Sequence, residues 1–149
     1  MAFLPVRITK HTDYALRTLL YLAVRPGQRC STQVIAEAYG ISSHHLQKVV
    51  RALGQHGLIH LHRGSQGGVE LAMDPAEISV GKVMRALDDQ EGLVECFKPE
   101  SNLCVITPSC GLKEALGGAQ EAFYAHLDPI TLSELVKRSR KQLRKLTGN

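Results

Sequence analysis

The sequence predicts a mainly α-helical fold with one small β-hairpin. Two observations lead to this fold class. Apolar residues recur every three or four positions through most of the chain, as in helices that bury one face. Two short β-type runs, LIHLH and VELAM, flank a glycine-rich turn, RGSQGG. The chain has 149 residues, 44% hydrophobic and 21% charged, which suits one core-bearing domain with an extension.

The first helix is expected over TDYALRTLLYLAV, residues 12–24. Its apolar stripe runs from Ala15 to Ala23, and Thr12 or Asp13 is available as the N-cap. The turn-forming sequence RPGQ follows and ends it. A helix with such a stripe requires a packing partner, so it is expected in the core.

Two short helices follow with a tight turn between them. The first, STQVIAEAYG at residues 31–40, is broken by Gly40, and Ser42 is suited to cap the second, SHHLQKVVRAL at residues 43–53. The residues expected to face inward are Val34, Ile35, Ala38, Leu46, Val49, Val50 and Leu53. A short helix, a glycine turn and a second short helix are the sequence form of a helix-turn-helix.

The β-hairpin comes directly after this pair of helices. Its two runs, residues 58–62 and 69–73, are joined by glycines that permit the positive φ angles of a hairpin tip. A hairpin in this position forms a wing, so the sequence predicts a winged helix-turn-helix DNA-binding domain.

Further helices are expected in the C-terminal half. One begins near Ser79 in ISVGKVMRAL, and a longer one runs from about Ser109 to Asp128. In the middle of the long helix, Gly117 and Gly118 cost about 1 kcal/mol each relative to alanine. They would let another backbone approach closely, which favours a dimerisation helix over a simple bend.

A last helix is expected after the capping box formed by Thr131 and Glu134. The basic tail KRSRKQLRK, residues 137–145, is interpreted as a solvated face.

Charge is unevenly distributed along the chain. The net charge is +4, yet the stretch from Ala38 to Val69 has no acidic residue and holds five of the seven histidines. This stretch coincides with the helix-turn-helix and the wing, which predicts a surface for double-stranded DNA. The residues expected to contact DNA are Ser43, His44, His45, Gln47, Lys48, Arg51 and Arg63. Gln47 and the two histidines suit base edges, and Lys48 and Arg51 suit phosphates. Arg63, at the hairpin tip, suits a minor groove.

Three cysteines lie within fifteen residues, in CFKPESNLCVITPSC. Seven residues separate Cys96 from Cys104, and five separate Cys104 from Cys110. The acidic residues just before and within this loop are Asp88, Asp89, Glu91, Glu95 and Glu100. Thiolates are the usual ligands of iron-sulfur clusters, which favours a cluster here. Structural zinc and inert or disulfide-forming thiols are the alternatives, although zinc sites usually contain close C-x-x-C pairs. Cys30 stands alone and is interpreted as a packed thiol.

Four segments resemble the winged-helix iron-sulfur regulators. They are RITKHTDYALRTLLYLA, IAEAYGISSHHLQKVVRALGQHGLI, RGSQGGVELA and ECFKPESNLCVITPSCGLKEAL, and the likeness runs from about Arg7 to Leu135. The cysteine segment is most similar to the nitric-oxide-sensing repressors of that family. The resemblance implies a homodimer that binds a palindromic DNA operator and carries an iron-sulfur cluster, 4Fe-4S or alternatively 2Fe-2S.

The resemblance also implies the cluster ligands. Cys96, Cys104 and Cys110 match the ligating cysteines, and Asp13 matches an aspartate that the partner subunit supplies in the nitric-oxide-sensing branch. The regulators of cluster assembly instead use a histidine three residues beyond the last cysteine, where this chain has Lys113. The implied function is repression that nitrosylation of the cluster relieves. The alternative is a sibling regulator whose 2Fe-2S cluster senses redox or iron-sulfur status.

The predicted organisation is a DNA-binding domain at 1–88, a cluster-binding loop at 89–110, and the dimerisation and C-terminal helices at 111–149. No apolar run approaches the length of a membrane span and no secretory signal is evident, so a cytoplasmic protein without a membrane partner is expected. An iron-sulfur electron carrier or a thiol-redox enzyme would explain the cysteines but not the wing. The sequence therefore predicts a regulator and not an enzyme.

Overall fold

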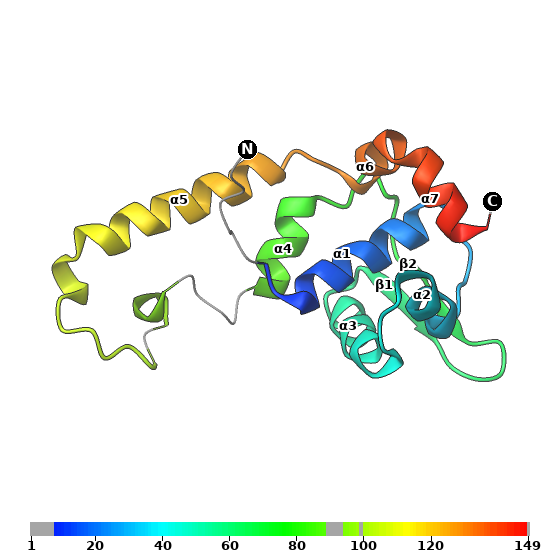
Figure 1. The fold of residues 1–149 in the computed structure, drawn as a ribbon, viewed down its shortest axis with the longest axis horizontal. Coiled ribbons are helices and arrows are strands. Elements are labelled where there is room, and N and C mark those ends of the chain that lie inside the picture. Colours follow the sequence, from blue (N-terminus) through cyan, green and yellow to red (C-terminus); the bar gives the residue numbers. More distant parts are fainter. Residues whose placement is uncertain (1–7, 89–93, 99, 149) are drawn as a thin grey trace.

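The computed structural model describes residues 8–88, 94–98 and 100–148 (Figure 1). Within these ranges the elements are α1 (Lys10–Ala23), α2 (Thr32–Tyr39), α3 (Ser43–Gln55), β1 (Ile59–His62), β2 (Gly68–Leu71), α4 (Val80–Asp88), the 3₁₀ turns η1 (Glu95–Phe97) and η2 (Thr107–Ser109), α5 (Gly111–Leu127), α6 (Leu132–Arg138) and α7 (Arg140–Thr147). The predicted mainly α-helical fold with a small β-hairpin is confirmed. Of the acidic residues named above, Asp89 and Glu91 lie outside the described ranges.

Helix α1 lies at the centre of the main core, and Ala15 and Leu19 on its inner face are fully buried. Its N-cap is Thr9, whose side chain accepts the N–H of Thr12 at 3.0 Å. The prediction that Thr12 or Asp13 caps this helix is wrong. The helix begins at Lys10, so both residues already lie within its first turns.

Helices α2 and α3 form the predicted helix-turn-helix. Gly40 adopts φ of 63° after α2, and the Ser42 side chain accepts the N–H of His45 at 3.3 Å to cap α3. The inward stripe of α3 is confirmed, since its four predicted apolar residues are all buried. On α2 the prediction fails at Val34, which is 46% exposed, while Ala36 is buried instead. The other two predicted positions hold, since Ile35 is fully buried and Ala38 packs against the core.

Strands β1 and β2 pair antiparallel, with Ile59 opposite Leu71 and His62 opposite Gly68. Cys30 adds an isolated bridge to β2: its N–H donates to the Val69 carbonyl at 2.9 Å, and the Val69 N–H returns a bond to the Cys30 carbonyl at 2.8 Å. A Cβ on Gly68 would lie 2.7 Å from the Cys30 carbonyl oxygen, so this close approach requires glycine. The wing is thereby tied to the segment that leads into α2.

Helix α5 extends away from the body formed by the other helices and the wing, with the cysteine loop at its far end (Figure 1). Tyr124 is its one buried residue, and it packs with Val80 and Met84 of α4 in a second small core. Each helix in the described ranges is too short or too polar to cross a membrane.

After α5 the chain returns to the main core. The predicted cap at Thr131 is confirmed: its side-chain oxygen accepts the N–H of Glu134 at 3.3 Å. Leu132 is fully buried in the core that α1 and α3 share. The prediction of one last helix is wrong, because the chain leaves the helical conformation at Ser139 and forms two helices, α6 and α7. The division into three segments at residues 88 and 110 stays a prediction.

Candidate nucleic-acid interface and cysteine loop

Helix α3 lies on the side of α1 opposite to α6 and α7 (Figure 1). With the apolar stripe buried, the remaining positions of this helix turn outward. The residues predicted to contact DNA are all exposed: Ser43, His44, His45, Gln47, Lys48, Arg51 and, in the hairpin turn, Arg63. Their roles in binding DNA stay predictions.

Two of these side chains have partners within the fold. The Ser43 hydroxyl donates to Gln33 Oε1 at 2.7 Å, which links α3 to α2. The imidazole of His45 lies against Tyr14 of α1, with ring centroids 6.5 Å apart. These contacts orient α3 relative to α2 and α1. Gln33 was not identified from the sequence, because its partner lies in the next helix.

A groove of about 670 Å³ separates α3 from the wing. Arg51 lines its α3 wall and Arg63 lines its wing wall, so two arginine residues border one concave surface. Leu61 of β1 packs directly on Gly54 of α3, where a Cβ would lie 2.1 Å from the leucine Cδ1. Glycine at this position lets the hairpin approach the helix closely. Gln55 also lines the groove, and the sequence carried no signal for it beyond its polarity.

The wing carries one carboxylate, Glu70 of β2. Its Oε1 lies 2.6 Å from His62 Nε2 and 3.9 Å from Arg29 Nε. The carboxylate is thus paired with neighbouring basic side chains, and the groove keeps a positive character. Arg29 was missed by the sequence reasoning because its proximity to the wing depends on the bridge at Cys30.

The cysteine loop connects α4 to α5, and all four cysteines of the chain are free. Cys96 is half-buried in η1, Cys104 is exposed, and Cys110 is half-buried. Cys110 is the N-cap of α5, and its Sγ accepts the N–H of Lys113 at 3.4 Å. A helix N-terminus favours a negatively charged ligand atom in this position.

Cys30 lies in a different environment. Burial raises the pKa of its thiol, an effect that a hydrogen bond from Tyr21 partly opposes. A thiol that is harder to ionise is a poorer metal ligand and nucleophile. This supports the interpretation of Cys30 as a packed residue.

Within the described ranges, no three His, Cys, Asp or Glu side chains come close enough together to hold a metal. Asp13 instead pairs with Arg17 one turn along α1, through contacts of 3.0 and 2.8 Å. The donor set still fits an iron-sulfur cluster in kind, because three free thiols share one short loop. Metal sites commonly assemble only as the metal binds. The ligand set Cys96, Cys104, Cys110 and Asp13 stays a prediction.

The base of the loop is fastened to α1 and α5 through Asp88, the last residue of α4. Its carboxylate accepts the Thr12 hydroxyl at 2.5 Å and the Tyr124 hydroxyl at 3.5 Å. One turn earlier, Arg85 makes two hydrogen bonds to Glu121, at 2.8 and 2.9 Å, and the guanidinium lowers the pKa of that carboxyl. These contacts join the loop and α5 to the N-terminal end of α1.

A family model described as Rrf2, iron-dependent transcriptional regulator, matches residues 8–138. The chain belongs to the Rrf2 family. Rrf2 membership and the regulator names of its relatives confirm a DNA-binding transcriptional regulator, as predicted, and not an enzyme.

Two relatives of this Rrf2 chain are named HTH-type transcriptional regulator NsrR. The protein from Bacillus subtilis is 48% identical over 133 residues, which cover 89% of this chain and 91% of the relative. The protein from Geobacillus kaustophilus is 45% identical over 142 residues, which cover 95% and 96%. Sequence similarity to regulators named NsrR therefore confirms the predicted family resemblance.

Solved structures agree with this placement. CymR of B. subtilis, described as the global cysteine regulator, has 29% identity and a TM-score of 0.68, covering 89% of this chain and 98% of CymR. IscR of T. potens has 26% identity and a TM-score of 0.70, covering 93% and 91%.

Proposed function

We propose that this Rrf2 protein is a dimeric repressor that senses nitric oxide through an iron-sulfur cluster, and that nitrosylation of the cluster relieves repression. The three free thiols in the single loop between α4 and α5 carry this proposal. The 48% identity to a regulator named NsrR supports it.

In this proposal Cys96, Cys104 and Cys110 hold a 4Fe-4S cluster, and the partner subunit's Asp13 supplies the fourth ligand. When bound, the cluster would offer nitric oxide one iron whose carboxylate ligand exchanges more readily than thiolate. Asp13 suits this role because its carboxylate is about one-third exposed at the outer side of α1. To reach iron it must release Arg17, and an exposed ion pair of this kind costs little to break.

The dimer is proposed to form through α5. Leu112 is 66% exposed and Phe123 is 36% exposed on this helix, and a Cβ added at Gly118 would meet no atom within 4 Å. This 17-residue helix buries only Tyr124, against α4, and within the described chain its exposed apolar side chains have no cover. A second copy would cover this surface. It would also place two α3 helices to read a palindromic operator, with half-sites about 34 Å apart.

The chain's own contacts provide a route from the loop to the DNA-reading helix. Asp88 holds α4 to Thr12 on α1, and α1 packs directly against α3. A loop whose thiols all bind one group is restricted to few conformations. Releasing the thiols would allow the loop to rearrange and shift α1, and with it the spacing of the two α3 helices.

Anaerobic purification tests the proposal. Absorbance and native mass spectrometry should detect a 4Fe-4S cluster, and nitric oxide should release the protein from its operator in a gel-shift titration. Alanine at any one of the three loop cysteines should abolish the chromophore and high-affinity operator binding while the dimer remains folded. Cys30→Ala is the matched control and should retain both.

Operator binding that is indifferent to cluster loss and to nitric oxide would refute the sensing role. A two-iron mass would instead identify the sibling regulator with a 2Fe-2S cluster.

A further inference from the structure

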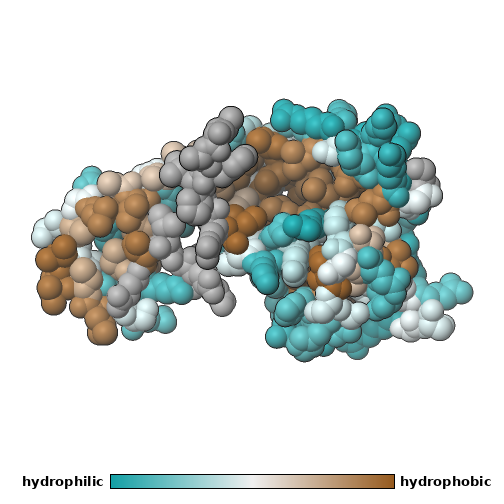
Figure 2. All heavy atoms as spheres, viewed as in Figure 1, coloured by the Kyte–Doolittle hydropathy of each residue, from teal (hydrophilic) through white to brown (hydrophobic). Residues whose placement is uncertain are grey.

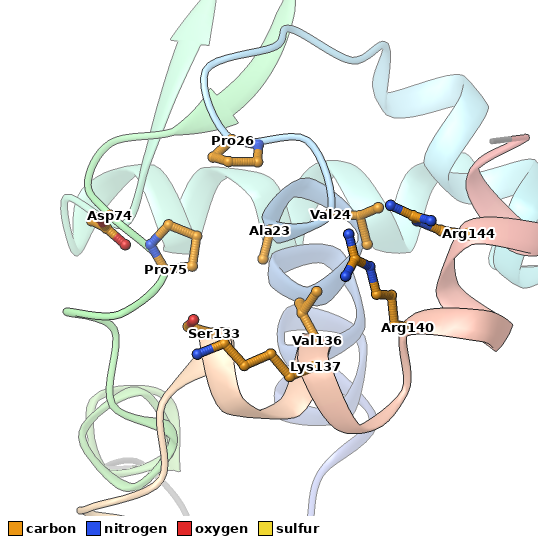
Figure 3. A pocket seen from close by; sticks show the side chains of 10 residues that line it. All are labelled: Ala23, Val24, Pro26, Asp74, Pro75, Ser133, Val136, Lys137, Arg140 and Arg144. Carbon is orange, nitrogen blue, oxygen red and sulfur yellow. The ribbon is translucent and has the colours of Figure 1, made fainter.

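A second concave site lies across α1 from α3. This pocket has a volume of about 350 Å³ and is formed by the end of α1, the segment after β2, and helices α6 and α7 (Figure 3). Its apolar lining comes from Ala23, Val24, Pro26, Pro75 and Val136. Apolar walls of this kind suit one hydrophobic side chain.

Three cations also line this pocket: Lys137, Arg140 and Arg144. Arg140 and Arg144 are one helical turn apart on α7, and both guanidinium groups lie beside Val24 (Figure 3). The single lining carboxylate, Asp74, is on the opposite side of the pocket in that view. The arginine side therefore favours an anionic group next to an apolar one.

The pocket belongs to a larger basic surface. Residues 137–145 contain six cations and no acidic residue, and within the described chain none of these six forms an ion pair. Space-filling representation shows this end of the molecule as strongly hydrophilic (Figure 2). Like charges four residues apart destabilise a helix. The arrangement thus lacks internal compensation and is suited to an external polyanion.

Helix α7 holds these cations in fixed positions. Leu143 and Thr147 are buried against the body of the protein. The Arg25 guanidinium, just after α1, donates to the Thr147 carbonyl at the other end of α7. A charged surface on an anchored helix loses less conformational entropy on binding than one on a free tail.

We propose that this pocket, with its cations Lys137, Arg140 and Arg144, binds an acidic peptide segment of a partner protein, with one apolar side chain inserted between the acidic ones. DNA held by α3 and the wing would lie on the other side of α1 (Figure 1). A small anion would pair with these cations but would leave the apolar wall of the pocket uncovered. An acidic peptide with an apolar anchor matches both features.

Fluorescence anisotropy of the full-length protein tests this site. The labelled peptide is a decapeptide with glutamates on both sides of a central phenylalanine. Arg140→Glu with Arg144→Glu should weaken binding by about tenfold or more. The matched control is Lys141→Glu with Lys145→Glu, which makes the same change in charge on α7 outside the pocket lining and should weaken binding by less than about threefold. Replacing the phenylalanine with glycine should also weaken binding.

Circular dichroism melting establishes that each variant is folded, and Val136→Asp gives a second variant directed at the apolar wall. Equal losses for the two charge-reversal variants would overturn the proposal, since they would indicate attraction without a pocket. Indifference to the phenylalanine would also overturn it. A labelled non-operator DNA duplex provides the last comparison. If the protein bound this duplex more tightly than the peptide, and Arg140→Glu with Arg144→Glu weakened both interactions equally, the proposal would also be overturned, because the occupant would then be nucleic acid.

Discussion

The groove between α3 and the wing predicts a measurable change in the salt dependence of operator binding. Arg51 and Arg63 line its two walls, both are exposed, and neither forms an ion pair within the described chain. If each guanidinium neutralises one phosphate per subunit, Arg51 at the backbone and Arg63 from within the minor groove, replacing both with alanine removes two such contacts per half-site.

Each lost contact lowers the slope of log K against log salt concentration by about 0.9. Two contacts per half-site lower it by about 1.8. Between about 50 and 200 mM salt, a fourfold change, the wild type should therefore lose about twelvefold more affinity per half-site than the double variant. Titrating a labelled half-site duplex at several salt concentrations, with anisotropy as the signal, measures both slopes.

A control distinguishes local contacts from net charge. Lys141→Ala with Lys145→Ala removes the same charge from α7, on the other side of α1, and should leave the slope nearly unchanged because exposed charges beyond about 8 Å are screened. An unchanged slope for the Arg51 and Arg63 variant would refute the assignment of this groove to DNA. An equal fall in both variants would show that net charge alone governs binding.

Three further predictions concern single positions. Asp13→Ala should change the absorbance spectrum of the anaerobically purified protein. Arg17→Ala, which removes only the ion-pair partner of Asp13, should leave the spectrum unchanged. It should lower the free energy of unfolding in urea by less than about 0.5 kcal/mol. Identical spectra for the two variants would exclude Asp13 as a ligand. Gly68→Ala should lower both stability and DNA affinity, because its Cβ would lie 2.7 Å from the Cys30 carbonyl oxygen; a wild-type melting temperature would contradict this. Burial raises the pKa of Tyr39 from 10.0 to about 12, so this hydroxyl ionises at lower pH in the unfolded chain than in the folded protein. The free energy of unfolding should therefore fall as the pH rises from about 10 to about 12. Tyr39→Phe should reduce this fall.

Much of the DNA-binding domain was predictable because its signals are local. The apolar stripe of α3, the Ser42 cap and the break at Gly40 each depend on residues within one or two turns of each other. The same holds for the Thr131 cap of α6. Burial of the α3 stripe then required the polar residues of that helix to be exposed. The sequence by itself therefore determined the helix-turn-helix, its outward residues and the confinement of three thiols to one loop.

Only the tertiary structure decided how distant segments meet. The wing is anchored by a β-bridge between Cys30 and Val69. The Thr12 hydroxyl donates a hydrogen bond to the carboxylate of Asp88, 76 residues away. Arg25 binds the Thr147 carbonyl at the end of α7, 122 residues away. Hydrophobic periodicity predicts that a helix has a buried face, but it does not predict which element covers that face. These contacts depend on the packing of several elements at once, so they exist only after the chain has folded.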